Sequence, residues 1–323
     1  MWAQTETFKY LCPHRVFMVY HEIRIKDKKQ YNYLIYNRRE DNKWVKKSKF
    51  IGIGKLSEDK ILKLKENFEQ QLVFEKNYEY LTAKQVVEIE RLRKLYADNL
   101  RKLGKEEFDI FEHSFFTELT YNSNAIEGSS LSMEDTALIL DEGLVPEGKT
   151  LREVYEAKNH ARALAFINNY KKDIDELFIL KIHAIILKDI SSNFAGRYRE
   201  SKVKIFGSDV NFPEAMLVPQ LVKNLVFWYK KNKRILHPFE LAAIFSMKFV
   251  TIHPFVDGNG RMSRLLMNLI LKRNSYPWIN IYNKQRREYL KAVRKANDEA
   301  YSEIIYILIN TLRENLDSFG FSR

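Results

Sequence analysis

The spacing of the apolar residues changes once along this chain, and that change limits the folds open to it. The first 55 residues alternate in short runs rich in Val, Ile, Tyr and Phe, whereas apolar residues recur at helical spacing almost everywhere after residue 82. A chain of 323 residues with 45% hydrophobic and 30% charged residues can bury a sizeable core. We therefore expect a mainly α-helical protein that begins with a small antiparallel β module.

Three strands are expected in the N-terminal module. The runs that predict them are VFMVYHEIRI (16–25), YNYLIYNRR (31–39) and WVKKSKFIGIG (44–54), separated by the polar turns KDKKQ and EDNK. So small a sheet needs an element to pack on, and the helix that Ser57 can cap is the natural candidate. Residues 1–50 hold 12 Lys and Arg against 5 Asp and Glu, a net charge of +7 within a chain total of +12. Such a surface could attract nucleic acid or an acidic partner, or could simply be solvated.

Two capping boxes mark helix starts in the rest of the chain. Thr82 with Gln85 opens a helix through Leu103, and Thr150 with Glu153 opens one through about Tyr170. Helical spacing continues in ELFILKIHAIILKDI, LVKNLVFWYKK, FELAAIFSMKFVTI, RMSRLLMNLILKR, REYLKAVRKAN and EIIYILINTL. The exception is GRYRESKVKIFGSDVNFP (196–213), whose alternation predicts a short hairpin. We expect a β module with its helix at 1–80, a helical region at 81–175 and a helical core carrying the hairpin at 176–323.

Composition excludes several classes of protein. The single cysteine, Cys12, rules out an internal disulfide and a cysteine-based zinc site. No window approaches the roughly 18 unbroken apolar residues of a membrane span. The first residues, MWAQTETFKY, lack the basic and apolar regions of a signal peptide. These features predict a cytoplasmic protein.

The stretch GLVPEGKT (143–150) satisfies the P-loop pattern G-x-x-x-x-G-K-[ST]. A working P-loop lies between a buried parallel strand and a helix, but Ser132 and Asp135 upstream are typical of a helix start. No succession of strand, helix and strand follows. We therefore expect a connection between helices, in which Gly143 ends one helix and Thr150 caps the next.

A denser set of functional side chains lies in HPFVDGNGRMSR (253–264). The glycines of GNG precede a helix N-terminus, where free backbone N–H groups and the positive end of the dipole form a nest for an anion. Arg261 and Arg264 are one helical turn apart and can reach the same anion. Asp257 supplies a hard oxygen ligand suited to Mg²⁺, and His253 suits a general base acting on a hydroxyl group. The similar HPFE at 237–240 lacks GNG and the arginines, so His237 is expected only to border a helix.

This stretch resembles the signature of the Fic family, HxFx[DE]GNGRxxR, at every specified position, and the similarity extends over roughly residues 110–310. The resemblance implies a helical Fic core with a β-hairpin flap, and transfer of AMP from ATP to a Ser, Thr or Tyr hydroxyl of a protein, with release of pyrophosphate. His253 would then deprotonate the target hydroxyl, and Asp257 would hold Mg²⁺ on the α- and β-phosphates. The anion would be cradled by Gly258, Asn259 and Gly260 and its β- and γ-phosphates gripped by Arg261 and Arg264.

The resemblance also assigns residues outside the signature. AGRYRESKVKIFGSD looks like the flap, whose edge could pair with an extended target segment. Gly207 and Ser208 would lie near the nucleotide. Tyr289 and Asn297, eight residues apart on one helix face, match positions that flank the nucleobase in similar proteins. On residue type alone, Tyr289 could equally be a core residue and Asn297 a polar helix end.

A second motif, SNAIEG at 123–128, resembles the Fic inhibitory motif [ST]xxxE[GN]. Its Ser123, Glu127 and Gly128 occupy the specified positions, ahead of the core as in class II members of the family. In similar proteins this Glu forms a salt bridge with the second signature arginine, here Arg264. Because the γ-phosphate needs that guanidinium, the contact implies autoinhibition.

The prediction is therefore an autoinhibited protein adenylyltransferase that uses ATP and Mg²⁺ and modifies a protein substrate, including itself. Two alternatives stay open: removal of AMP or transfer of another nucleotide by the same site, and nucleic-acid-binding regulation through the basic N-terminal sheet. The resemblance also leaves a homodimer open. No membrane partner is expected.

Overall fold

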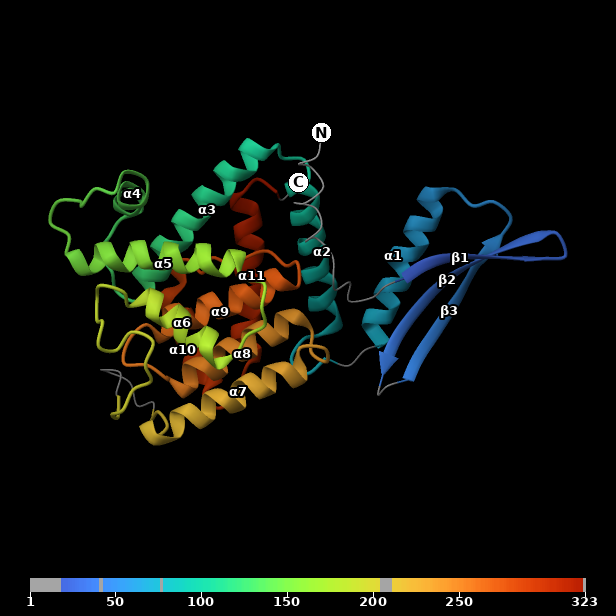
Figure 1. The fold of residues 1–323 in the computed structure, drawn as a ribbon. Coiled ribbons are helices and arrows are strands. Elements are labelled where there is room, and N and C mark those ends of the chain that lie inside the picture. The colour runs from blue at the N-terminus through green and yellow to red at the C-terminus, as the bar shows by residue number, and fades with distance from the viewer. Residues whose placement is uncertain (1–18, 41–42, 76–77, 204–210, 322–323) are drawn as a thin grey trace. The chain divides into compact units, whose positions relative to one another are not determined.

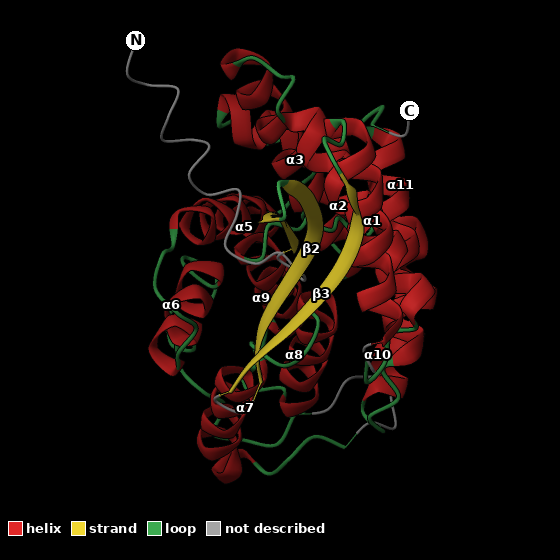
Figure 2. Cartoon of the chain, turned by 90° about the vertical axis from the view of Figure 1, so that its right-hand side faces the viewer, coloured by secondary structure: helices red, strands yellow, loops and turns green. Residues whose placement is uncertain are grey.

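The computed structural model describes residues 19–40, 43–75, 78–203 and 211–321, and these divide into two compact units. The first unit spans Met1–Glu90 and the second spans Arg91–Arg323 (Figure 1). Helices dominate the described chain, and the sheet belongs to the first unit (Figure 2). The predicted class, mainly α with a small N-terminal antiparallel sheet, is confirmed.

The sheet is a meander of β1 (Val19–Lys26), β2 (Lys29–Glu40) and β3 (Lys43–Ile53), in that order. Both pairings are antiparallel, with Val19 opposite Tyr36 and Tyr36 opposite Lys47. Asp27 and Lys28 form the β1–β2 turn with φ of 49° and 61°, and positive φ at both central residues matches the strand twist. Helix α1 (Glu58–Glu75) follows, and the Lys60 N–H lies 3.4 Å from Ser57 Oγ, as expected of a capping serine.

The second unit is a set of packed helices. Helix α2 begins in the first unit and ends in the second. None of the helices in the described ranges combines the length and apolar character needed to span a bilayer. The helices are α2 (Ala83–Leu100), α3 (Lys105–Ile126), α4 (Met133–Ala137), α5 (Leu151–Asn169), α6 (Glu176–Ile186), α7 (Val218–Asn232), α8 (Pro238–Ile252), α9 (Asn259–Arg273), α10 (Arg286–Ala296) and α11 (Ser302–Ser318).

Helices α8 and α9 form the centre of this unit. Most side chains of both helices are buried, and α5, α7, α10 and α11 pack around them (Figure 1). The loop 253–258 joins the C-terminal end of α8 to the N-terminal end of α9. Because this helix hairpin is buried on most sides, its connecting loop is held from several directions.

The capping boxes predicted at Thr82 and Thr150 are present, the helix start expected at Ser132 also has a capping box, and each begins a helix. The α2 helix ends at Leu100, three residues before the predicted end, because residues 101–103 form a turn. His237 is the N-cap of α8, as expected. The predicted hairpin at 196–213 remains a prediction, because residues 204–210 lie outside the described chain and the flanking described residues belong to no strand.

The structure contradicts a P-loop at GLVPEGKT. Gly143 has φ of 75° and ends the π-helical turn Leu138–Glu142, and Thr150 caps α5. The Lys149 ammonium is occupied by the carbonyl of Ser130, 2.6 Å away, and by Asp135 Oδ2, 3.3 Å away. The stretch is a connection between helices, and its lysine binds protein groups.

Candidate active site

The loop 253–258 closes on itself through one side chain. The amide of Asn259 donates to the carbonyl of Phe255, and its oxygen accepts the Phe255 N–H, at 2.8 and 3.0 Å. Asn259 is 3% exposed. Its side chain is therefore committed to loop closure, and only its backbone is left to cradle an anion.

Glycine is required where this loop meets α9. Gly258 has φ of 81°, a conformation that costs other residues about 1 kcal/mol or more. A Cβ there would also lie 3.3 Å from the Ile186 side chain. The Asp257 carboxylate accepts the Gly258 N–H at 2.5 Å, and a negative group is favoured at this helix start.

His183 of α6 also holds the loop 253–258, a contact that was not predicted from the sequence. Its Nδ1 accepts the Gly196 N–H at 3.0 Å, so Nε2 carries the proton and donates to the Asp257 carbonyl at 3.1 Å. The ring stacks on Phe255 with centroids 3.6 Å apart. Burial lowers the pKa of His183 to about 4, so the ring is neutral. A lone histidine in an apolar helix was the only sequence signal.

His253 ends α8 in the left-handed conformation, with φ of 49° and ψ of 60°. This geometry is uncommon for a residue with a Cβ and directs the ring out of the helix line. The ring stacks on Phe212 with centroids 4.0 Å apart. Burial lowers the pKa of His253 to about 4, while the Val250 carbonyl acts against that shift. A neutral imidazole at pH 7 can accept a proton.

Arg199 fixes the backbone of His253. Its guanidinium donates to the carbonyls of His253, Ser201 and Pro213 at 2.8, 3.1 and 2.6 Å. The backbone N–H of Arg199 donates to the Pro254 carbonyl at 3.0 Å. Arg199 is 2% exposed, so these carbonyls replace its hydration. The residue ties both described ends of the predicted flap to His253, and sequence reasoning did not single it out.

Arg261 faces Asp257 and has guanidinium N–H groups that are not used in hydrogen bonds to described residues. Its Nη2 lies 3.3 Å from Asp257 Oδ1, and its Nη1 lies 3.5 Å from Glu156 Oε1. The guanidinium is 2% exposed, and Nε and Nη1 make no hydrogen bond to described residues. Because buried donors are normally satisfied, this group is suited to an anion with several oxygens. Arg152 of α5 contacts both carboxylates from the other side, at 2.6 Å for Asp257 Oδ2.

Arg264 is held by the end of α3. Its Nη2 lies 2.8 Å from Glu127 Oε1 and donates to the Ser123 carbonyl at 2.8 Å, while Nε donates to Ser123 Oγ at 3.0 Å. Arg264 is 5% exposed, whereas the Glu127 side chain is 40% exposed. Glu127 is the C-cap of α3, and Gly128 beyond it has φ of 104°. The predicted Glu127–Arg264 contact is present.

The Glu127 carboxylate also lies over the start of α9. A Cβ placed on Gly260 would be 2.1 Å from Glu127 Oε1. The Glu127 carboxylate therefore lies directly against the Gly260 backbone, at the helix end that favours an anion. Glu127 occupies the region expected for a phosphate group.

The segment that carries Glu127 is anchored on both sides. Arg286 donates to the Ile126 carbonyl at 2.7 Å, and Asn122 Oδ1 accepts the Asn283 N–H at 2.9 Å. Beyond Gly128, the Ser130 N–H is bound by Glu153 Oε1 at 2.7 Å. The carboxylate is thus presented by a well-held backbone.

The remaining predicted site residues fall in three places. Tyr289 of α10 is buried next to Arg264, and burial raises the pKa of its hydroxyl. Asn297 follows α10 and accepts a hydrogen bond from Thr251 Oγ1 at 2.7 Å, two residues before His253. Gly207 and Ser208 lie outside the described residues.

The side chains present fit a Mg²⁺ ion shared with phosphates. No group of three or more potential ligands among His, Cys, Asp and Glu occurs in the described part of the chain. Asp257 is a 38% exposed carboxylate beside the anion nest. Mg²⁺ is commonly held by one or two carboxylates together with substrate phosphates, and one carboxylate with a bound nucleotide satisfies that pattern.

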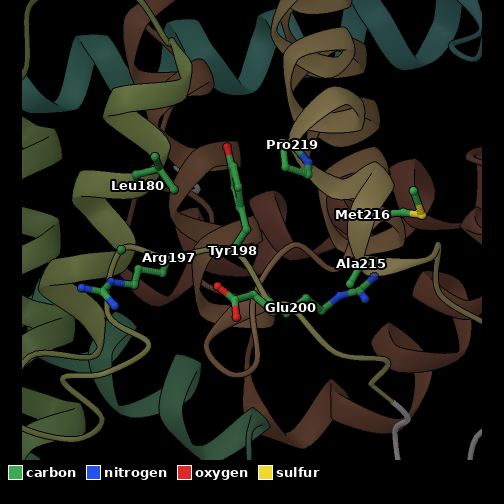
Figure 3. A pocket seen from close by; sticks show the side chains of 9 residues that line it. Leu180, Arg197, Tyr198, Glu200, Ala215, Met216 and Pro219 are labelled. Carbon is green, nitrogen blue, oxygen red and sulfur yellow. The ribbon is translucent and has the colours of Figure 1, made fainter.

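A cavity of about 560 Å³ adjoins the site through the segment 196–200. Arg199 contributes to its wall as well as to the His253 loop. Figure 3 shows the Tyr198 ring between Leu180 of α6 and Pro219 of α7, with charged groups of Arg197 and Glu200 nearby. The cavity therefore combines apolar walls with both signs of charge.

Comparison with known proteins matches residues 173–271 to the Fic/DOC family. Protein adenylyltransferase fic-1 of Caenorhabditis elegans is 34% identical over 204 residues, covering 61% of this chain and 38% of the relative. Protein adenylyltransferase Fic of Nematostella vectensis is 33% identical and covers 62% and 47%. The chain thus spans less than half the length of these curated relatives.

Solved structures show the same fold. A Fic-domain-containing signalling protein from Bacteroides thetaiotaomicron aligns with a TM-score of 0.63 and 28% identity, covering 70% of this chain and 94% of that one. Fic-1 from C. elegans (aa134–508) aligns with a TM-score of 0.65 and 26% identity, covering 82% and 77%.

Proposed function

The chain contains a domain of the Fic/DOC family, and from that premise we propose that it is an autoinhibited protein adenylyltransferase. It transfers AMP from ATP to a hydroxyl group of a protein. The observation that carries the proposal is the pairing of Arg264 with Glu127 over an otherwise open anion nest. The site is built to bind a polyanion, and one movable carboxylate occupies it.

The reaction follows from the positions of the protein groups. His253, neutral at pH 7, accepts the proton of the target hydroxyl, whose oxygen attacks the α-phosphorus. The bond between the α-phosphorus and the bridging oxygen breaks, and pyrophosphate leaves with the electron pair. The backbone at Gly258–Gly260 and the spare donors of Arg261 stabilise negative charge on the phosphates.

Asp257 is the residue that would hold Mg²⁺. Bound there with ATP, the ion would neutralise phosphate charge and help the pyrophosphate to leave. Arg152 contacts Oδ2 of the same carboxylate at 2.6 Å, so a metal bound through that oxygen would compete with Arg152.

Glu127 acts as the inhibitor in this proposal. While it pairs with Arg264, that guanidinium cannot grip the γ-phosphate, and the α-phosphate is not aligned for attack. Arginine contacts to transferring phosphates are worth roughly 10³–10⁵ in rate in related chemistry, so masking one is an effective control.

The protein target would approach along the segment 196–213. The neighbouring 560 Å³ cavity, with walls from Leu180, Met216 and Pro219, suits an apolar side chain next to the modified residue. Pairing of a target strand with the flap would add backbone hydrogen bonds. The predicted nucleobase contacts of Tyr289 and Asn297, the homodimer and the cytoplasmic location stay part of the proposal.

Transfer of radiolabelled AMP to the protein itself tests the assignment. Glu127→Gly should increase labelling at least tenfold over the parent, and Glu127→Gly with His253→Ala should return it to background. Glu142→Gly, at another exposed glutamate, serves as the control and should match the parent. Equal labelling of parent, Glu127→Gly and the double variant would refute the proposal.

The same site could instead remove AMP or transfer another nucleotide. Mass spectrometry of the labelled protein separates these outcomes, because AMP and UMP adducts differ in mass. Incubating AMP-modified protein with the parent and with Glu127→Gly tests removal: loss of AMP with the parent alone would assign Glu127 to hydrolysis.

A further inference from the structure

Helix α1 covers one face of the N-terminal sheet, and the opposite face is partly exposed. Leu34 and Tyr36 of β2 are buried, and Lys49, which pairs with Leu34, contacts Gln71 and the Phe68 ring of α1. Because side chains alternate along a strand, the odd-numbered residues of β2 lie on the opposite face. We call this opposite surface the aromatic face, made of Tyr20, Tyr31, Tyr33 and Phe50 with Glu22, Arg24 and Lys46.

Three rings of the aromatic face form a continuous group. Phe50 lies 5.5 Å from Tyr33 and 6.3 Å from Tyr31 between ring centroids. Phe50 is 50% exposed and Tyr20 is 39% exposed, which is high for aromatic residues within a sheet. The group ends at Ile35, which is fully buried.

Positive charge is interleaved with these rings. The Arg24 guanidinium lies 4.3 Å from the centroid of the Tyr33 ring. Residues 19–56 contain eleven Lys and Arg against four Asp and Glu, a net charge of +7. Among the described residues of the aromatic face only Glu22 is acidic, and it pairs with Arg24 at 2.6 Å and with Lys46 at 3.5 Å.

From this combination we propose that the aromatic face binds single-stranded nucleic acid. Flat exposed rings on a sheet offer stacking surfaces for bases, and the surrounding lysines and arginines neutralise phosphates. Glu22 pairs with both Arg24 and Lys46, and in this proposal the phosphates take its place. A duplex keeps its bases stacked inside, so the rings would be of little use to it. This activity is separate from AMP transfer.

The test uses the full chain and fluorescently labelled 12-nucleotide oligomers: single-stranded RNA, single-stranded DNA and a DNA duplex, the length lying in the roughly 4–16-nucleotide range of such sites. Anisotropy titrations at several salt concentrations should give tighter binding to a single strand than to the duplex. The affinity should fall as salt rises. Tighter binding to the duplex, or no binding to any oligomer at low salt, would overturn the proposal.

Variants locate the binding surface. Phe50→Ala should weaken single-strand binding about tenfold, because it removes a stacking surface for a base. Glu22→Gln should strengthen it several-fold, a gain that misfolding cannot produce. Arg24→Gln with Lys46→Gln should reduce the salt slope by about 0.7 for each phosphate that is no longer neutralised.

The matched control is Lys60→Gln with Lys63→Gln, two exposed lysines of α1 with the same change in charge. It should change the affinity less than twofold. If the control weakens binding as much as the variant of the aromatic face, or if Glu22→Gln leaves the affinity unchanged, the aromatic face is not the site. AMP transfer by Phe50→Ala should equal that of the parent.

Discussion

Arg264 and Glu127 lie 137 residues apart in the chain and meet with Nη2 and Oε1 separated by 2.8 Å. The arginine is buried and is held by this contact and two bonds to Ser123, while the glutamate stays partly exposed. The pair is therefore asymmetric. Glu127 can leave for solvent at modest cost, but Arg264 needs a replacement anion.

A substitution of Ser123 tests how much Arg264 depends on its neutral partners. Ser123→Ala removes the Nε–Oγ bond and leaves the backbone carbonyl and Glu127 as partners of Arg264. We expect a loss of about 1–3 kcal/mol in the free energy of unfolding, because a buried charged donor loses its acceptor. Basal AMP transfer should rise only a few-fold, less than with Glu127→Gly. Chemical denaturation and labelling assays measure the two effects, and a stability equal to that of the parent would contradict the first.

Gly260 tests whether Glu127 and a phosphate share one space. Gly260→Ala places a methyl group where Glu127 Oε1 now lies, 2.1 Å from the ideal Cβ position. In a Glu127→Gly background the methyl group should still occupy the anion nest. Calorimetry should then show ATP binding at least tenfold weaker than for Glu127→Gly alone. Equal affinities would mean that phosphate and Glu127 occupy different places.

Arg199 is expected to act through His253. Arg199→Lys, made in the Glu127→Gly background, loses the fork that reaches three carbonyls at once. We expect kcat to fall about 10–100-fold while the Kd for ATP changes less than threefold, because the anion nest is untouched. Arg197→Lys is the neighbouring control. Loss of ATP binding in step with kcat would indicate a general structural role instead.

A substitution of Lys149 tests which of the two candidate phosphate-binding motifs, GLVPEGKT or HPFVDGNGRMSR, binds ATP. Lys149→Met removes an ammonium bound to Ser130 and Asp135. In a Glu127→Gly background, ATP affinity should change less than twofold, whereas a P-loop lysine would lose its phosphate partner. Equilibrium binding of ATP measures this, and a large loss would return GLVPEGKT to the nucleotide site.

Acid should destabilise the fold through its buried histidines. Burial lowers the pKa of His183 and His253 to about 4 and that of His160, which bonds Thr120, to about 3. Their value in the unfolded chain is near 6.5. The unfolded state therefore binds more protons below pH 6.5, and stability falls as the pH drops from 6.5 toward 4. We expect a loss of about 1–2 kcal/mol per histidine between pH 7 and 5.

Denaturant titrations at several pH values measure this dependence. His183→Asn should have a shallower pH dependence below pH 6.5 than the parent. Stability that rises between pH 7 and 5 would contradict the sign. AMP transfer through His253 should not decline from its own titration until the pH approaches 4.

Much of the fold was predictable because its signals are local. The capping boxes of Thr82, Ser132 and Thr150 each operate within three residues, and all three begin helices. The strands and their turns also depend on neighbours. Helix α3 was predicted only as part of a helical region, although its end carries Glu127.

The site divides in the same way. The sequence was sufficient to predict the residues that lie within one stretch of twelve, namely His253, Asp257, the glycines of the nest, Arg261 and Arg264. It also predicted Glu127, because the motif around Glu127 resembles one known to pair with the second signature arginine. Three features depended on tertiary structure: the hold of Arg199 on His253, the hold of His183 on Asp257, and the contact of Arg152 with Asp257. These contacts join residues 54 to 105 positions apart. No local pattern encodes them, since they exist only once the packed helices bring these groups together, and for Arg199 and His183 burial then makes the pairing obligatory.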